Sequence, residues 1–135
     1  MKLAKIFLII LFLILTLTSC SYEQGVVLFN KEPVTRQNIT QDSKTFSAGN
    51  RVYYIFLAPE KIKNDFIRVQ IFKMTDLAPW GGNNVVRTKD CRLLKDEKYY
   101  HSDYFVLYEK GRYVMQIFSH DDFQHPIAIN DFYIE

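Results

Sequence analysis

The sequence predicts an all-β fold: an antiparallel β-sandwich of about seven strands, preceded by an N-terminal hydrophobic signal helix. Two observations carry this prediction. Short segments that are dense in β-branched and aromatic residues recur along the chain, and polar turns separate them. Beyond residue 20, no segment shows the sustained helical spacing of apolar residues that an α/β fold requires. A chain of 135 residues is long enough for one such domain.

The first nineteen residues have the composition of a secretory signal. Lys2 and Lys5 precede an unbroken apolar run at residues 6–15, and a basic start followed by such a run is typical of export. A helix from Ile6 to Leu17 would be about 18 Å long, against about 30 Å of membrane hydrocarbon. The segment is therefore too short for a comfortable membrane span.

Leu17-Thr18-Ser19-Cys20 resembles the lipobox of bacterial lipoproteins, in which an aliphatic and two small residues precede the lipidated cysteine. The resemblance covers the first twenty residues. It implies a diacylglycerol on the Cys20 sulfur, cleavage before Cys20, and a lipid-anchored protein of the bacterial cell envelope. Because Ser21 rather than Asp follows the cysteine, it implies the outer membrane in a Gram-negative cell. The alternative is an uncleaved N-terminal helix in which Cys20 has no role.

The predicted organisation has three parts. Residues 1–19 are the signal peptide, residues 20–24 are the lipidated cysteine with a short tether, and residues 25–135 are the sandwich domain. The signal holds two of the 17 basic side chains and none of the 15 acidic ones, so fifteen of each remain after its removal. A domain without a net excess of basic residues is not expected to bind nucleic acid.

The first strands of this domain follow from composition and alternation. Residues 26–29 predict a short strand. Residues 51–58 are rich in Val, Ile, Tyr and Phe, which predicts a strand buried on both faces in the middle of a sheet. Residues 66–73 alternate between apolar and polar side chains, so one face of this strand is expected to meet the core and the other to meet water.

The second half of the domain contains the strongest turn signal. Residues 103–109 and 112–119 flank Lys110-Gly111, where glycine can adopt positive φ, and they predict a β-hairpin. Shorter or less regular strands are expected at three further places: residues 85–88, 91–94 and 127–134.

Glu109-Lys110-Gly111-Arg112-Tyr113-Val114-Met115 resembles the acidic-x-Gly-x-Tyr-x-Cys stretch at the corner between strands E and F of immunoglobulin domains. The resemblance implies an immunoglobulin-like sandwich in which Gly111 and Tyr113 form the structural tyrosine corner, with the tyrosine hydroxyl bonded to backbone just upstream. Met115 stands in the place of the disulfide cysteine, and Trp80 falls in a loop rather than in a strand. The alternative is a plain hairpin with a core tyrosine.

Candidate chemistry is sparse. Once Cys20 is lipidated, Cys91 is the one remaining thiol; it is expected to be buried and inert, and the alternative is a thiolate nucleophile paired with His101 or His120. His120-Asp121-Asp122-Phe123-Gln124-His125 holds metal-ligating side chains, but such residues after a strand more often form a turn. We therefore predict no catalytic residue, no metal and no cofactor.

Residues 75–84 form the best candidate for a partner-binding loop. Trp80 offers a large rigid contact surface, and Gly81 and Gly82 supply an adaptable backbone. The alternative is that Trp80 folds back to cap the sandwich and the glycines serve the turn alone.

Three classes of function remain open. The favoured one is a non-catalytic binding or structural module, held at the membrane through lipid on Cys20, that meets an envelope protein or a glycan. The second is an accessory subunit or a carrier for a hydrophobic ligand, because nine Tyr, nine Phe and Trp80 lie beyond the signal. The third is a cysteine-dependent enzyme that uses Cys91.

Overall fold

The structure, a computed structural model, describes residues 25–75 and 84–135. The predicted signal peptide, the lipobox with Cys20, and the loop with Trp80, Gly81 and Gly82 lie outside the described residues. The described elements follow in chain order: β1 (Val26–Asn30), β2 (Thr45–Phe46), β3 (Arg51–Leu57), β4 (Phe66–Lys73), β5 (Val85–Arg92), the 3-10 turn η1 (Lys95–Glu97), β6 (Tyr100–Val106), β7 (Gly111–Ser119) and β8 (Ala128–Ile134).

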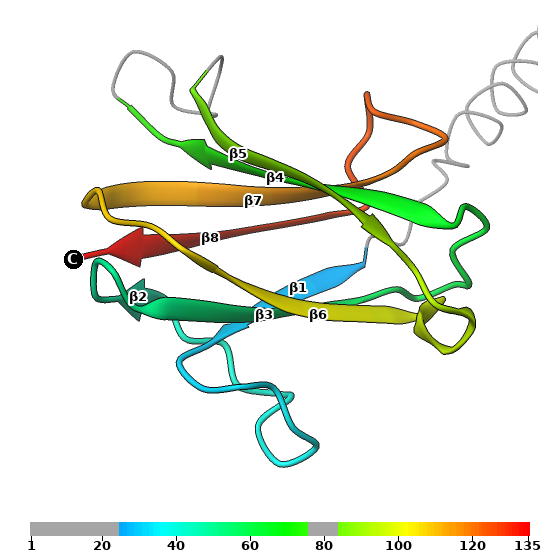
Figure 1. Cartoon of the computed structure of the whole chain (residues 1–135), viewed down its shortest axis with the longest axis horizontal. Coiled ribbons are helices and arrows are strands. Elements are labelled where there is room, and N and C mark those ends of the chain that lie inside the picture. The colour runs from blue at the N-terminus through cyan, green and yellow to red at the C-terminus, as the bar shows by residue number, and fades with distance from the viewer. Residues whose placement is uncertain (1–24, 76–83) are drawn as a thin grey trace, which may run out of the picture.

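The strands form two sheets that lie face to face, as Figure 1 shows. One sheet has the order β1-β3-β6 and the other has the order β2-β8-β7-β4-β5. Neighbours are antiparallel, except that the two-residue β2 runs parallel to β8. β1, β3 and β6 correspond to strands A, B and E of an immunoglobulin domain, while β4, β7 and β8 correspond to C, F and G. The predicted fold class, an immunoglobulin-like β-sandwich, is therefore confirmed.

Aromatic rings fill the space between the two sheets. Phe132 of β8 lies at the centre of this core and is fully buried. The centroid of its ring lies 4.8 Å from that of Phe29, 5.3 Å from that of Phe105 and 5.6 Å from that of Tyr113. Much of the aromatic surplus of the sequence thus serves the core, which holds the two sheets together without a disulfide.

The predicted hairpin at Lys110-Gly111 is wrong. β6 belongs to the three-stranded sheet and β7 to the five-stranded sheet, so the chain crosses from one layer to the other at this corner. Gly111 has a φ of +150°, which residues with a side chain rarely adopt. The Tyr113 hydroxyl donates a hydrogen bond of 2.6 Å to the Glu109 carbonyl, which is the contact that defines a tyrosine corner.

The other predicted strands are found with small shifts. β3 lies between β1 and β6, in the middle of its sheet as expected. β4 coincides with residues 66–73, and its alternation places Ile67, Val69 and Ile71 in the core. The two short strands expected at residues 85–94 are one continuous strand, β5. Within the described residues, no helix is long and apolar enough to cross a membrane.

Candidate functional site

The outer face of the three-stranded sheet is apolar and aromatic. Because strand side chains alternate and Val27, Val52, Tyr54 and Phe105 lie in the core, the intervening side chains point outward. Two side chains of this outward set, Asn30 and Ile55, are nevertheless buried. We call the others the aromatic face; it consists of Val26, Leu28, Arg51, Tyr53, Leu57, Tyr100, Ser102, Tyr104 and Val106. Among these described positions, Arg51 carries the only charge.

Two tyrosines and an arginine form the most prominent part of the aromatic face. Tyr53 and Tyr104 are cross-strand partners whose ring centroids lie 5.7 Å apart. The Arg51 guanidinium lies over the Tyr104 ring at 4.7 Å. Tyr104 and Tyr100 remain 42% and 40% exposed. Tyrosine and arginine are enriched among the residues that dominate binding energy at protein interfaces, so this composition is typical of a docking surface.

The outer face of the five-stranded sheet is different. Its side chains pair with one another across strands: Arg68 forms two hydrogen bonds to Asp90, at 2.8 and 3.1 Å, and Arg112 binds Asp131 at 2.7 Å. The Arg68 hydrogen bond lowers the pKa of Asp90 to about 2. This face satisfies its own charged groups, although Ile129 and Tyr133 on it are 46% and 43% exposed.

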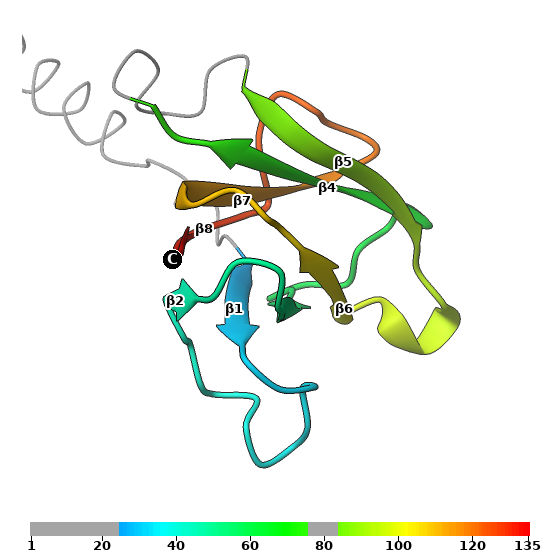
Figure 2. The ribbon, with the colours of Figure 1, turned by 60° about the vertical axis from the view of Figure 1, so that its left-hand side comes forward.

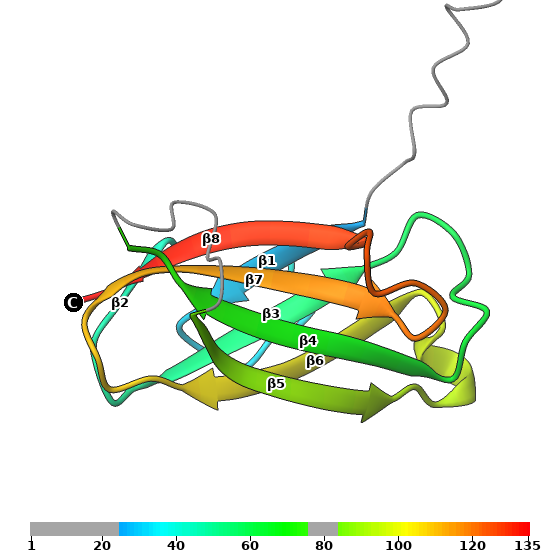
Figure 3. The ribbon, with the colours of Figure 1, turned by 90° about the horizontal axis from the view of Figure 1, so that it is seen from above.

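A second feature lies at the open edge of the sandwich, where β5 and β6 are the outermost strands of their sheets and run near each other (Figures 2 and 3). Cys91 of β5 and His101 and Asp103 of β6 point between the sheets, and one ligand atom from each lies within 4.8 Å of the others. We call these three residues the polar edge. Lys89, two residues before Cys91 on β5, forms an ion pair with Asp103.

His101 is the least satisfied side chain of the polar edge. It is 9% exposed, and neither ring nitrogen has a hydrogen-bond partner among the described residues. The nearest carboxylate oxygen, from Glu97, is 3.9 Å from Nδ1, which is too far for a hydrogen bond. Burial lowers the pKa of His101, although the charges of Glu97 and Asp103 act in the opposite direction. The imidazole is therefore neutral in ordinary buffers.

Burial also governs the other two groups. It raises the pKa of the Cys91 thiol, against the attraction of the Lys89 ammonium. Burial by itself would raise the pKa of Asp103 too, but hydrogen bonds from Lys89 and the Tyr104 backbone outweigh it and the pKa is lowered. Cys91 is therefore a protonated thiol and Asp103 a carboxylate. A nucleophilic cysteine needs a lowered pKa, so these shifts weigh against the thiolate hypothesis.

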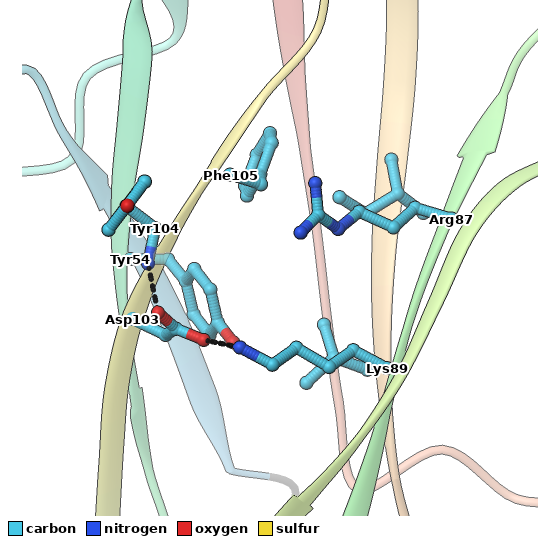
Figure 4. A pocket seen from close by; sticks show the side chains of 8 residues that line it. Tyr54, Arg87, Lys89, Asp103, Tyr104 and Phe105 are labelled. Atoms are coloured by element: carbon cyan, nitrogen blue, oxygen red, sulfur yellow. Dashed lines mark hydrogen bonds and ion pairs between the residues drawn. The ribbon is translucent and has the colours of Figure 1, made fainter.

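A small cavity adjoins the polar edge. Figure 4 shows Tyr54, Asp103 and Phe105 facing Arg87 and Lys89 across it. Its volume is about 10 Å³, which is the space of about one water molecule. A hydrophobic ligand does not fit between the sheets at this place.

The remaining histidines lie elsewhere. His120, which follows β7, lies against the outer side of β5, where its Nε2 is 3.1 Å from an Asp90 carboxylate oxygen. His101, and not His120, therefore lies beside Cys91 between the sheets. His125 pairs with Asp122 at 2.8 Å through Nδ1. Asp121, Asp122 and His125 lie at the rim of an open hollow of about 630 Å³ beside Gly25. The two histidines of residues 120–125 therefore bind different carboxylates: His120 binds Asp90, and His125 binds Asp122.

Sequence reasoning named Cys91 and His101 but did not name Asp103 or the aromatic face. The signal for Asp103 was its spacing of two from His101, which puts both side chains on one face of a strand. The signal for the aromatic face was the density of apolar residues at residues 51–58, which exceeds what one buried face requires.

The topology, the corner and the two outer faces define an immunoglobulin-like β-sandwich module. No family model matches the chain, and no curated protein matches it in sequence. Solved structures resemble it distantly. An immunoglobulin-like protein from Pseudomonas aeruginosa is 11% identical, and the alignment covers 81% of this chain and 96% of that one with a TM-score of 0.45.

Two further structures show the same level of likeness. The alkylpurine DNA glycosylase AlkC of Pseudomonas fluorescens, bound to DNA containing an abasic site analog, is 14% identical over 81% of this chain, with a TM-score of 0.43; the alignment spans 30% of the glycosylase. The CARDB domain of a Pyrococcus furiosus protein in complex with di-metal ions is 8% identical over 83% of this chain and 94% of its own, with a TM-score of 0.41. No ligand or reaction is transferred from these proteins.

Proposed function

We propose that this chain is a lipid-anchored, non-catalytic binding module of the bacterial cell envelope, and that the aromatic face is the surface that meets its partner. The observation that carries the proposal is the contrast between the two outer faces. Both sheets expose large apolar side chains: Ile129 and Tyr133 of the five-stranded sheet are 46% and 43% exposed, and Tyr100, Tyr104 and Val26 of the three-stranded sheet are 40%, 42% and 49% exposed. The five-stranded sheet sets paired charges among these side chains, whereas Arg51 is the one charge among the residues of the aromatic face. Exposed apolar and aromatic surface with few charges is typical of the centre of a protein interface.

The composition of this face favours a protein partner over a glycan. Two tyrosines with an arginine stacked on one of them give a rigid surface whose apolar and polar parts both suit a protein interface. A glycan remains the alternative outcome of the test below.

The predicted tether supports access to this face. If the lipid is on Cys20, four residues lie between it and Gly25, and the five residue-to-residue steps of a fully extended chain span at most about 18 Å. The domain would then lie close to the bilayer, held at the end of the sandwich where β1 begins. Val26 of the aromatic face lies at that end, but Tyr53 and Tyr104 lie at the far end of β1, opposite Asn30, so a neighbouring envelope protein could reach them.

The two alternative functions receive less support from the described residues. A carrier of a hydrophobic ligand needs an apolar cavity of several hundred cubic ångströms, whereas the space beside Tyr54 is about 10 Å³ and the larger hollow is open and bordered by charged side chains. A cysteine-dependent enzyme needs an activated thiolate, and burial shifts the pKa of Cys91 in the opposite direction.

The partner surface is tested by photo-crosslinking in cells. A photoreactive amino acid at position 104 is compared with the same residue at position 70, because Gln70 lies on the outer face of the other sheet. We expect a discrete crosslinked protein from position 104 and none from position 70. Equal crosslinking from both positions, or a product at 104 that glycosidases remove, contradicts the protein-binding assignment.

The lipid anchor is tested separately by labelling with radioactive palmitate and by intact mass. The wild-type protein should incorporate label and lose residues 1–19, and Cys20→Ala should do neither. An unlabelled wild-type protein that keeps its first nineteen residues would refute the anchor without touching the question of the aromatic face.

A further inference from the structure

The polar edge brings together three side chains that coordinate metals in proteins. Cys91 comes from the five-stranded sheet, and His101 and Asp103 come from the three-stranded sheet. Their ligand atoms lie within 4.8 Å of one another, while ligands around a tetrahedral Zn²⁺ ion are about 3.3 to 3.8 Å apart. Closing that difference takes movements of about 1 Å, which side-chain rotation supplies.

His101 provides independent evidence that something is bound here. A buried polar atom without a hydrogen bond costs about 1 to 3 kcal/mol, and His101 has two of them among the described residues. Such groups are rare in folded proteins unless an ion, a water molecule or a ligand completes them. An imidazole that is buried, neutral and without a partner has a free lone pair for a metal.

We infer that Cys91, His101 and Asp103 form a binding site for a divalent transition-metal ion of the Zn²⁺ type. Sulfur and imidazole ligands select ions of this class and disfavour Ca²⁺ and Mg²⁺, which take oxygen ligands. Three protein ligands leave a fourth position that a water molecule fills. The site goes beyond the proposed docking function, because it needs no partner protein and because His101 and Asp103 point to the opposite side of β6 from Tyr100 and Tyr104.

The surroundings fit this assignment. A metal-bound histidine usually directs its other ring nitrogen at a carboxylate, and Glu97 Oε2 lies 3.9 Å from His101 Nδ1. The metal would therefore bind Nε2, with Glu97 behind the ring. On binding, the Cys91 thiol loses its proton to solvent and a metal–sulfur bond forms. Asp103 exchanges its Lys89 partner for the metal, and Lys89, which is 48% exposed, returns to water.

The expected consequence is a clamp between the two sheets. β5 and β6 are edge strands of different sheets, so an ion held by Cys91 on one and His101 on the other joins the layers where no backbone hydrogen bonds do. A ligand that binds the folded state alone stabilises it in proportion to the logarithm of its concentration. The thermal midpoint should therefore rise as metal is added.

The test uses the whole chain, purified in detergent and stripped with a chelator. It is titrated with Co²⁺, whose thiolate complex absorbs light, and with Zn²⁺ by calorimetry. We expect one equivalent to bind, with a cobalt–thiolate absorption band and a rise in the thermal midpoint. Cys91→Ser should abolish the band, and His101→Gln and Asp103→Asn should each weaken binding at least about tenfold.

Two controls keep the result specific. Cys20→Ala must bind as the wild type does, which assigns the thiolate band to Cys91. The paired variant Asp122→Asn, His125→Gln removes an exposed carboxylate and imidazole and must leave binding unchanged. Circular dichroism establishes that each variant is folded, and Asp103→Asn, at a half-buried position, is the one that should disturb the fold least.

The inference is overturned by any of three results: no saturable binding to the wild type, a thiolate band that persists in Cys91→Ser, or equal affinity in wild type and in folded Asp103→Asn and His101→Gln. None of these results bears on whether the aromatic face binds a partner.

Discussion

The two edges of the sandwich are closed in different ways. At one edge, β1 lies beside β8, and every polar side chain that joins them has partners. Asn130 of β8 donates to the Val27 carbonyl at 2.7 Å, and Asp42 accepts from the Phe29 amide at 3.1 Å. Lys44 binds Asp42 at 3.0 Å. At the other edge, β5 and β6 are joined across by the ion pair of Lys89 and Asp103, and His101 has no partner among the described residues.

This difference distinguishes two kinds of polar group: those around Asn130, which stabilise the fold, and those of the polar edge, which are free to bind a ligand. The Asn130 edge satisfies its donors and acceptors internally, which makes it structural. The polar edge leaves two buried nitrogens unsatisfied, at a cost that folding must offset elsewhere. Unsatisfied buried groups of this kind are typical of functional sites, where binding of a ligand offsets their cost in stability. The following predictions test whether the two edges respond to mutation in opposite directions.

The largest effect is expected at the satisfied edge. Asn130→Leu removes the donor to the Val27 carbonyl and leaves that acceptor unpaired, so the free energy of unfolding should fall by about 2 kcal/mol. Urea denaturation monitored by tyrosine fluorescence measures it. Gln116→Leu on the outward face of β7 is the control and should change stability by less than about 0.5 kcal/mol. Equal effects of the two variants would mean that the Asn130 edge is not special.

At the tyrosine corner, the expected loss of stability on mutation is intermediate between those at the two edges. Tyr113→Phe keeps the ring in the core and removes the hydrogen bond to Glu109, so the free energy of unfolding should fall by about 1 kcal/mol. Tyr108→Phe, on an 80% exposed ring, should have no measurable effect. A loss at Tyr108 as large as that at Tyr113 would contradict a structural role for the corner hydroxyl.

At the polar edge, mutation should leave stability unchanged or increase it, rather than lower it. In metal-free buffer, His101→Leu replaces two unsatisfied nitrogens with apolar atoms of similar size, so the free energy of unfolding should stay the same or rise by up to about 1 kcal/mol. The same urea experiment measures it, in the presence of a chelator. A loss of more than about 1 kcal/mol would show that His101 contributes to the fold as Asn130 does.

The smallest expected effect is a pH dependence at the polar edge. Because burial lowers the pKa of His101 in the folded state, the unfolded chain binds a proton below about pH 6.5 that the folded chain does not. Stability should therefore decline as the pH falls from about 6.5 toward that lowered pKa, with no contribution from His101 above about 6.5. The charged and titratable groups that face the ring are Glu97 of η1, Asp103 of β6, Lys89 and Cys91 of β5, and Tyr54 of β3.

Urea midpoints at several pH values between about 7 and about 5.5 measure this slope. His101→Leu should flatten the curve relative to wild type, and Gln116→Leu, which removes no titratable group, should not. Asp103 stays ionised over this range because its pKa is lowered, so its own loss of stability belongs to a more acidic window. An unchanged slope in His101→Leu would assign the pH dependence to another group.

The strands could be predicted from the sequence wherever apolar and polar residues alternate, because the alternation shows which side chains face the core. β4 is such a strand, because Arg68 and Gln70 mark the outward side between Ile67, Val69 and Ile71. β2 has two residues, too few for any pattern. At Gly111 the sequence supported two predictions, a hairpin and a tyrosine corner, because a short glycine turn suits both connections. Which one forms depends on how the two inward rows pack, and local sequence does not record that packing.

The candidate site was less predictable than the fold. Cys91 and His101 could be named as reactive residue types, but their proximity depends on where β5 and β6 lie relative to each other across two sheets. Asp103 became visible as their neighbour when that arrangement was known. The aromatic face was hidden for the opposite reason: at residues 51–58 both faces of the strand are apolar, and sequence alone assigned both to the core.

Met115, at the position where immunoglobulin domains carry a core cysteine, makes the folding of this domain independent of an oxidant. Its side chain is fully buried between the sheets. Packing of this side chain therefore stabilises the core at the place where a disulfide does so in immunoglobulin domains. The core of the described residues therefore reaches its native packing without an oxidation step, with Cys91 as a free thiol.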